Sequence, residues 1–141
     1  MWKLSPGDRI TGIRKEDGLL LQAVTDQILG TGIEVHKALG PGLLESAYEQ
    51  CLCHELRLRN VQFARQVAVP VRYKGIELDC GYRVDLLVED SVVLELKAVD
   101  RLMPIHEAQL LTYLRLSEKR VGLLMNFNVS ALRYGVVRRV L

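Results

Sequence analysis

Residues 81–99, with the sequence GYRVDLLVEDSVVLELKAV, constrain the fold more than any other stretch of the chain. Two apolar runs of strand length flank a short polar turn, which is typical of a β-hairpin. Each run carries charge where a buried strand would have none: Asp85 in the first, and Glu95 and Lys97 in the second. Because side chains alternate faces along a strand, we expect Glu95 and Lys97 to point the same way.

The length of the turn decides whether Asp85 shares that face. If residues 89–91 form a three-residue loop, Val88 pairs with Val92. Counting back along both strands then sets Asp85 directly opposite Glu95, whereas a shift by one residue would send the two carboxylates to opposite faces. The three-residue loop is favoured because it gathers the apolar residues into one continuous hydrophobic face: Val84, Leu86, Val88, Val92, Leu94, Leu96 and Ala98.

Two carboxylates that face each other across a hairpin repel, so a positive group is expected between them. Lys97 is one candidate. A hard divalent cation is another, since Mg²⁺ typically uses one or two protein carboxylates together with water and phosphate oxygens. The pattern is also compatible with a surface face that carries an ordinary ion pair between strands.

The composition is that of a single globular domain. The chain has 141 residues, of which 49% are hydrophobic and 26% charged. No stretch approaches the roughly 18 apolar residues that span a bilayer, and the N-terminus has no apolar stretch of signal-peptide length. We therefore expect no membrane association and a cytoplasmic location.

Charge and cysteine content give weaker indications. The net charge of +2 does not by itself predict a nucleic-acid surface, although a local groove could still provide one. Cys51, Cys53 and Cys80 are odd in number and lack a paired CxxC spacing. We interpret them as reduced, partly buried core thiols, without a disulfide or zinc site.

The order of elements predicts an α/β domain with a mixed sheet flanked by helices. Residues 1–18 are expected to form an irregular N-terminal lead-in, and residues 19–141 a single domain. We expect the hairpin to be central and the helix after Pro104 to cross to a strand parallel to residues 92–99. Arg138 and Arg139 are predicted to be exposed on the last strand. Helices are expected at residues 19–39, 44–59 and 105–116, and strands at residues 61–71, 83–88, 92–99, 122–127 and 135–141.

The segment GLLESAY, residues 42–48, resembles the GxxExxY protein family, which is named for that motif. Further segments resemble the characteristic blocks of that family in the same order, so the resemblance covers roughly residues 20–140. These segments are EVHKALGPGLLESAYE, YRVDLLV, VLELKAV, PIHEAQLLTYL and GLLMNFN.

The resemblance implies membership of the PD-(D/E)XK nuclease superfamily and a restriction-endonuclease-like core. The superfamily signature places an Asp on one hairpin strand and (D/E)-X-K on the next, which correspond here to Asp85 and to Glu95, Leu96 and Lys97. A Glu on an earlier helix would be Glu45. The chain departs from the fullest signature in having Val84, not Pro, before Asp85.

The family also implies the chemistry. Asp85, Glu95 and the backbone carbonyl of Leu96 would bind Mg²⁺ or Mn²⁺, which acidifies water and polarises a phosphate. Lys97 would position or help to deprotonate the attacking water. Glu45 would bind a second metal ion or hold its water.

A Gln-xxx-Tyr helix of related nucleases corresponds to Gln109 and Tyr113. Gln109 would orient water or phosphate, and substrate contacts are expected from Tyr113, Tyr48 and His106. The chain is thus expected to be a metal-dependent nuclease acting on nucleic acid, with DNA as the expected substrate. The alternative is a non-catalytic nucleic-acid-binding or protein-interaction module on the same fold. A second subunit of a homodimer, or a partner protein, could contribute to substrate binding.

Overall fold

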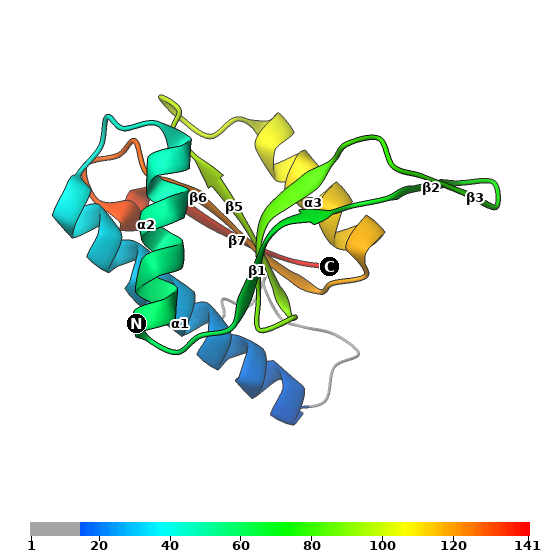
Figure 1. Ribbon diagram of the computed structural model, residues 1–141, viewed down its shortest axis with the longest axis horizontal. Helices are drawn as coiled ribbons and strands as arrows, with labels where there is room; N and C mark the ends of the chain where they lie inside the picture. The colour runs from blue at the N-terminus through cyan, green and yellow to red at the C-terminus, as the bar shows by residue number, and fades with distance from the viewer. Residues whose placement is uncertain (1–14) are drawn as a thin grey trace.

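The structure is a computed structural model, and it describes residues 15–141. Figure 1 shows a twisted sheet with helices on both sides and a narrow ribbon of two strands that projects from the body. The predicted irregular lead-in falls almost entirely on residues outside the described part. The elements in chain order are α1 (Lys15–Leu39), α2 (Glu45–Leu58), β1 (Phe63–Ala68), β2 (Val71–Tyr73), β3 (Ile76–Leu78), β4 (Arg83–Val88), β5 (Val92–Lys97), α3 (Pro104–Ser117), β6 (Val121–Asn126), the 3₁₀ helix η2 (Leu132–Tyr134) and β7 (Val136–Val140).

The main sheet is mixed, as predicted. Its strand order is β1-β4-β5-β6-β7, so the two hairpin strands lie inside the sheet. β5 pairs in parallel with β6, and α3 makes the crossover between them, whereas the other neighbours pair antiparallel. β2 and β3 form the separate ribbon, which leaves the sheet between β1 and β4.

Helices cover the two faces of the sheet unequally. α1 and α2 pack on one face and α3 on the other, which creates two hydrophobic cores (Figure 1). The larger core, on the α1–α2 face, includes Ile28, Leu52 and Leu94, and the smaller one, beneath α3, includes Val93 and Leu110. None of the helices in the described residues combines the length and the apolarity needed to cross a membrane.

The hairpin register is the one that the three-residue loop predicts. Val88 pairs with Val92 and Leu86 with Leu94. All but one member of the predicted hydrophobic face pack in or against the larger core. The exception is Val84, which lies in the smaller core beneath α3. That prediction was wrong because β4 does not keep a regular alternation through Asp85.

Three further predictions differ from the structure. α1 begins at Lys15, earlier than the predicted residue 19. Arg138 is 1% exposed, because it lies on the same face of β7 as Val136 and Val140, whose side chains pack against the larger core. Arg139 is half-buried and pairs with Glu107 on α3.

The cysteines are free, as predicted, but only Cys53 is a core thiol. Its burial raises the pKa of the thiol. Cys51 lies on the outer side of α2, and Cys80 lies in the exposed segment that follows β3. The prediction that all of them are partly buried was therefore wrong for these two residues.

Tyr48 fixes the loop that leads into α2. Its side chain is 0% exposed, and its ring stacks on Phe127 with the centroids 4.6 Å apart. Its hydroxyl group donates to the carbonyl of Gly40 at 2.6 Å and accepts the backbone N–H of Leu43 at 3.1 Å. These contacts set where α2 begins, and hence where Glu45 lies.

Tyr48→Phe should therefore lower the free energy of unfolding by about 1–3 kcal/mol, because two part-buried hydrogen bonds, each contributing about 0.5–1.5 kcal/mol, are lost. Urea denaturation measures this difference. Tyr134→Phe is the matched control: Tyr134 is 66% exposed and should change stability by less than about 0.5 kcal/mol. Equal effects of the two substitutions would contradict the role given to the Tyr48 hydroxyl.

Candidate functional site

Asp85 and Glu95 converge where the hairpin strands stop pairing through their backbones. Backbone pairing of β4 with β5 extends from Val88 and Val92 to Leu86 and Leu94. Beyond that point the Asp85 N–H donates to Glu95 Oε1 at 3.0 Å, and the Leu96 N–H donates to Asp85 Oδ2 at 2.7 Å. Each acid thus accepts a hydrogen bond from the backbone of the opposite strand, which brings both carboxylates to one place.

Burial raises the pKa of both acids, and a neighbouring carboxylate adds to the rise in each: Asp85 for Glu95, and Glu49 for Asp85. The pKa of Glu95, which is 5% exposed, rises to about 8, first because of burial and second because of the Asp85 charge. The Asp85 N–H and Lys97 oppose this rise only in part. Burial likewise raises the pKa of Asp85, although the Leu96 N–H acts in the other direction. The positive charge of Lys97 is therefore not enough to return the pKa of either carboxylate to its ordinary value.

Lys97 and Glu45 lie close enough to act on this pair. Lys97 favours the charged forms of Glu45, Asp85 and Glu95, yet within the described residues its ammonium group makes no direct ion pair with them. Glu45 is exposed in the first turn of α2, and its pKa is raised by loss of hydration first and by Asp85 second. The two strands and α2 thus contribute charged groups to one region.

α3 supplies the linked pair of Gln109 and Tyr113. The Gln109 amide donates to the Tyr113 hydroxyl at 3.0 Å, as expected for residues four apart on a helix. Tyr113 is 6% exposed, and its pKa is raised by burial first and by Glu95 second. The structure therefore brings Tyr113 near the two acids, and Gln109 is joined to them through Tyr113.

Two residues that the sequence assigned to substrate are engaged within the fold. Tyr48 is buried and its hydroxyl is used by the loop before α2, so the structure gives it a packing role instead of a surface that substrate reaches. His106 accepts the Met103 N–H on Nδ1 at 2.9 Å, which satisfies a free backbone group at the start of α3.

Sequence reasoning missed a second polar group beside Asp85. Glu49 is 8% exposed and accepts hydrogen bonds from Arg65 at 2.6 Å and Gln66 at 2.8 Å. Gln66 also approaches Asp85 Oδ1 at 3.4 Å. A sequence signal existed in part, because Glu49 follows Glu45 by four residues and hence shares its side of α2.

The donor set of the site fits a hard divalent cation. Asp85 and Glu95 each use one carboxylate oxygen for a backbone N–H, at 2.7 Å and 3.0 Å, and each has a second oxygen. Mg²⁺ needs only one or two protein carboxylates when water and phosphate supply the other ligands. Among the residues that the structure describes, no group of three or more His, Cys, Asp or Glu side chains is arranged to hold a metal ion.

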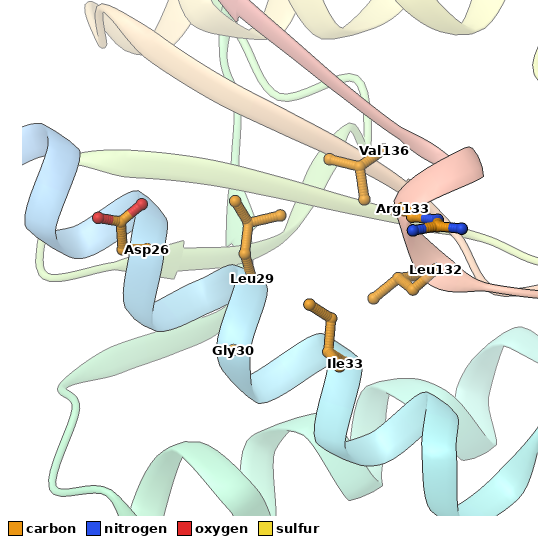
Figure 2. Close-up of a pocket in the computed structure, with 7 residues that line it drawn as sticks. All are labelled: Asp26, Leu29, Gly30, Ile33, Leu132, Arg133 and Val136. Carbon is orange, nitrogen blue, oxygen red and sulfur yellow. The ribbon is translucent and has the colours of Figure 1, made fainter. Parts of the chain in front are cut away.

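A cavity of about 500 Å³ lies elsewhere, between α1 on one side and η2 with the start of β7 on the other. Figure 2 shows the side chains of Leu29 and Ile33 from α1 directed toward Leu132 and Val136. Its lining is mostly apolar, with Asp26 and Arg133 as the charged members. None of the acids described above lines this cavity, which is therefore separate from the site at Asp85 and Glu95.

One of the comparisons with known proteins identifies a family. The family model described as the PD-(D/E)XK nuclease superfamily matches residues 22–140, a range that includes Glu45, Asp85, Glu95 and Lys97. No match was found among curated proteins or among solved structures. The mixed five-stranded sheet with helices on both faces is the restriction-endonuclease-like fold that the sequence predicted. The chain belongs to the PD-(D/E)XK nuclease superfamily.

Proposed function

We propose that this protein is a metal-dependent nuclease that hydrolyses phosphodiester bonds in nucleic acid, with DNA as the substrate. The observation that carries the proposal is the convergence of Asp85 and Glu95 from adjacent strands, with Lys97 within electrostatic reach. Membership of the superfamily supports nuclease-type chemistry. The raised pKa of Glu95 supports it as well, because a cation would relieve the repulsion that contributes to that shift.

Asp85 and Glu95 would hold Mg²⁺ or Mn²⁺ through their second carboxylate oxygens, and the Leu96 carbonyl is a further candidate ligand. When bound, such an ion supplies Lewis acidity toward a phosphate oxygen and lowers the pKa of water. The backbone N–H groups of Asp85 and Leu96 fix the two carboxylates by occupying one oxygen of each. Preorganisation of this kind reduces the entropy lost when ligand binds.

The other side chains would act on water and phosphate. Lys97 would attract the scissile phosphate and orient the attacking water, since its ammonium group is not committed to an ion pair with Asp85, Glu95 or Glu45 within the described chain. Glu45, exposed at the edge of the site, would accept a proton or hold a water. Gln109 would orient water or phosphate through its amide, with Tyr113 fixing the amide position.

Cleavage assays test the proposal directly. Purified protein should cut DNA in Mg²⁺ or Mn²⁺ and lose the activity in EDTA. Asp85→Asn should reduce the rate at least about 100-fold, because the amide cannot replace the anionic ligand. Asp90→Asn is the matched control, since Asp90 is exposed in the hairpin turn and pairs with Lys119 instead.

The substrate range is measured in the same assay with single-stranded and double-stranded DNA and RNA. Cleavage that survives both Asp85→Asn and Lys97→Ala would indicate a contaminating nuclease and remove support for the proposal. Salt-sensitive binding of nucleic acid without any need for a divalent cation would favour the alternative, a non-catalytic binding module.

Metal binding has a readout that does not depend on activity. At pH 8 and an Mn²⁺ concentration of about 100 times its dissociation constant, wild-type protein should gain about 2.7 kcal/mol of stability. Asp85→Asn should gain much less, and Asp90→Asn should match the wild type. Thermal unfolding followed by circular dichroism measures the gain. An equal gain in Asp85→Asn would place the ion elsewhere.

The stability of metal-free protein should depend on the ionisation of Glu95. Its pKa is 4.5 in the unfolded chain and about 8 in the folded one, so between these values the folded state binds more protons. The free energy of unfolding should therefore fall as pH rises from about 4.5 to about 8. Glu95→Gln removes this dependence on pH. The free energy of unfolding of Glu95→Gln, relative to that of the wild type, should therefore increase by about 2–4 kcal/mol over this range, at roughly 1.4 kcal/mol per pKa unit.

Urea denaturation in EDTA at pH 5, 6.5 and 8 measures this difference. Glu107→Gln is a suitable control, because Glu107 pairs with Arg139 outside the acidic cluster. A constant difference between wild type and Glu95→Gln over the whole range would show that Glu95 ionises normally in the folded protein.

A further inference from the structure

We infer that Gln66, held by Glu49, which is itself ion-paired with Arg65, is a positioning residue for the Asp85 carboxylate. The inference rests on the proposed function, because it concerns how the proposed metal ligand is oriented. No feature of the superfamily signature points to Gln66. The backbone of β1 and the hydrogen bonds of the Gln66 amide support this role.

The backbone conformation of β1 changes at Gln66. Its φ of 50° lies in the left-handed region, which a residue with a side chain enters only at a cost in free energy. On one side of it, Arg65 reaches Glu49 on α2, whereas Val67 on the other side packs against the core beneath α3. Residues two apart on a regular strand share a face, so β1 switches faces at Gln66.

The neighbouring strand switches at the same level. Arg65 pairs with Leu86 and Val67 with Val84, so Gln66 lies opposite Asp85. Leu86 packs in the core beneath α1 and α2, and Val84 in the core beneath α3. Gln66 and Asp85 therefore lie opposite each other on the adjacent strands β1 and β4. Their side chains approach each other at the level where both strands change the face toward which their side chains point.

The Gln66 amide connects two carboxylates at that point. Its Nε2 donates to Glu49 Oε1 at 2.8 Å and lies 3.4 Å from Asp85 Oδ1. The two hydrogens of the amide nitrogen allow one bond to each acid. Because Asp85 Oδ2 accepts the Leu96 N–H, Asp85 receives a donor from β1 on one oxygen and from β5 on the other.

Glu49 and Arg65 hold the amide in turn. Glu49 Oε2 accepts from Arg65 at 2.6 Å, so both Glu49 oxygens are engaged, and only 8% of the residue is exposed. A buried carboxylate needs such a partner, because an unpaired buried charge is strongly unfavourable. The pair fixes Glu49 and so presents one oxygen to Gln66. Outer-shell contacts of this kind typically change metal affinity 10–100-fold.

Calorimetric titration of the full chain with Mn²⁺ tests the inference. Gln66→Met keeps the length of the side chain and removes the donor, and it should weaken Mn²⁺ binding about 10-fold or more. Gln62→Met is the matched control: Gln62 is exposed just before β1, and the hydrogen bond to Glu89 comes from its backbone N–H. It should bind Mn²⁺ with wild-type affinity.

A second variant separates positioning from folding. Gln66→Asn suits the left-handed backbone, because Asn adopts that conformation readily. Its shorter amide cannot span Glu49 and Asp85. We expect Gln66→Asn to retain the wild-type unfolding temperature in EDTA and to lose Mn²⁺ affinity as Gln66→Met does.

Wild-type Mn²⁺ affinity in both Gln66 variants would overturn the inference and leave the proposed function intact, since that function depends on Asp85 itself. Wild-type affinity in Asp85→Asn would overturn both. A loss of affinity in Gln66→Asn with unchanged unfolding temperature supports the positioning role, because a merely structural residue would not produce that combination.

Discussion

The exchange of hydrogen bonds between Asp85 and the Glu95–Leu96 segment is the constraint on which the site depends. Each carboxylate takes the place of a backbone carbonyl, at 3.0 Å for the Asp85 N–H and 2.7 Å for the Leu96 N–H. The strands can then separate without leaving these buried N–H groups unsatisfied. Removing either acid would therefore disturb the opening of the sheet as well as its charge.

The two hydrophobic cores stabilise this separation of β4 from β5. Holding Gln66 in the left-handed region costs about 1–2 kcal/mol, and burying two neighbouring carboxylates costs more. The two cores on opposite faces of the sheet offset these costs, since apolar burial contributes roughly 25 cal/mol per Å². Strain of this kind persists where the surrounding structure determines the conformation, which is typical of functional sites.

Local sequence pattern was sufficient to predict the hairpin, its register and the parallel crossover. Loop length fixed the pairing of Val88 with Val92, and the order of elements predicted that the strand after α3 lies parallel to β5. It failed at Val84, because strict alternation assumes a regular strand. Local sequence pattern could not predict the hydrogen bonds of Glu49 with Arg65 and Gln66, because they join residues 16 and 17 positions apart on different elements.

Charge balance connects the site to its proposed substrate. Among the residues that the structure describes, four acids meet there with two basic residues, Arg65 and Lys97, and Arg65 is already paired with Glu49. The acids are Glu45, Glu49, Asp85 and Glu95. A phosphodiester is itself an anion, so it would be repelled by such a cluster. A divalent cation between Asp85 and Glu95 would offset this excess of negative charge and relieve the burial of like charges at once. On this argument the acids that make metal-free protein less stable at high pH are the same ones that make substrate binding conditional on the metal.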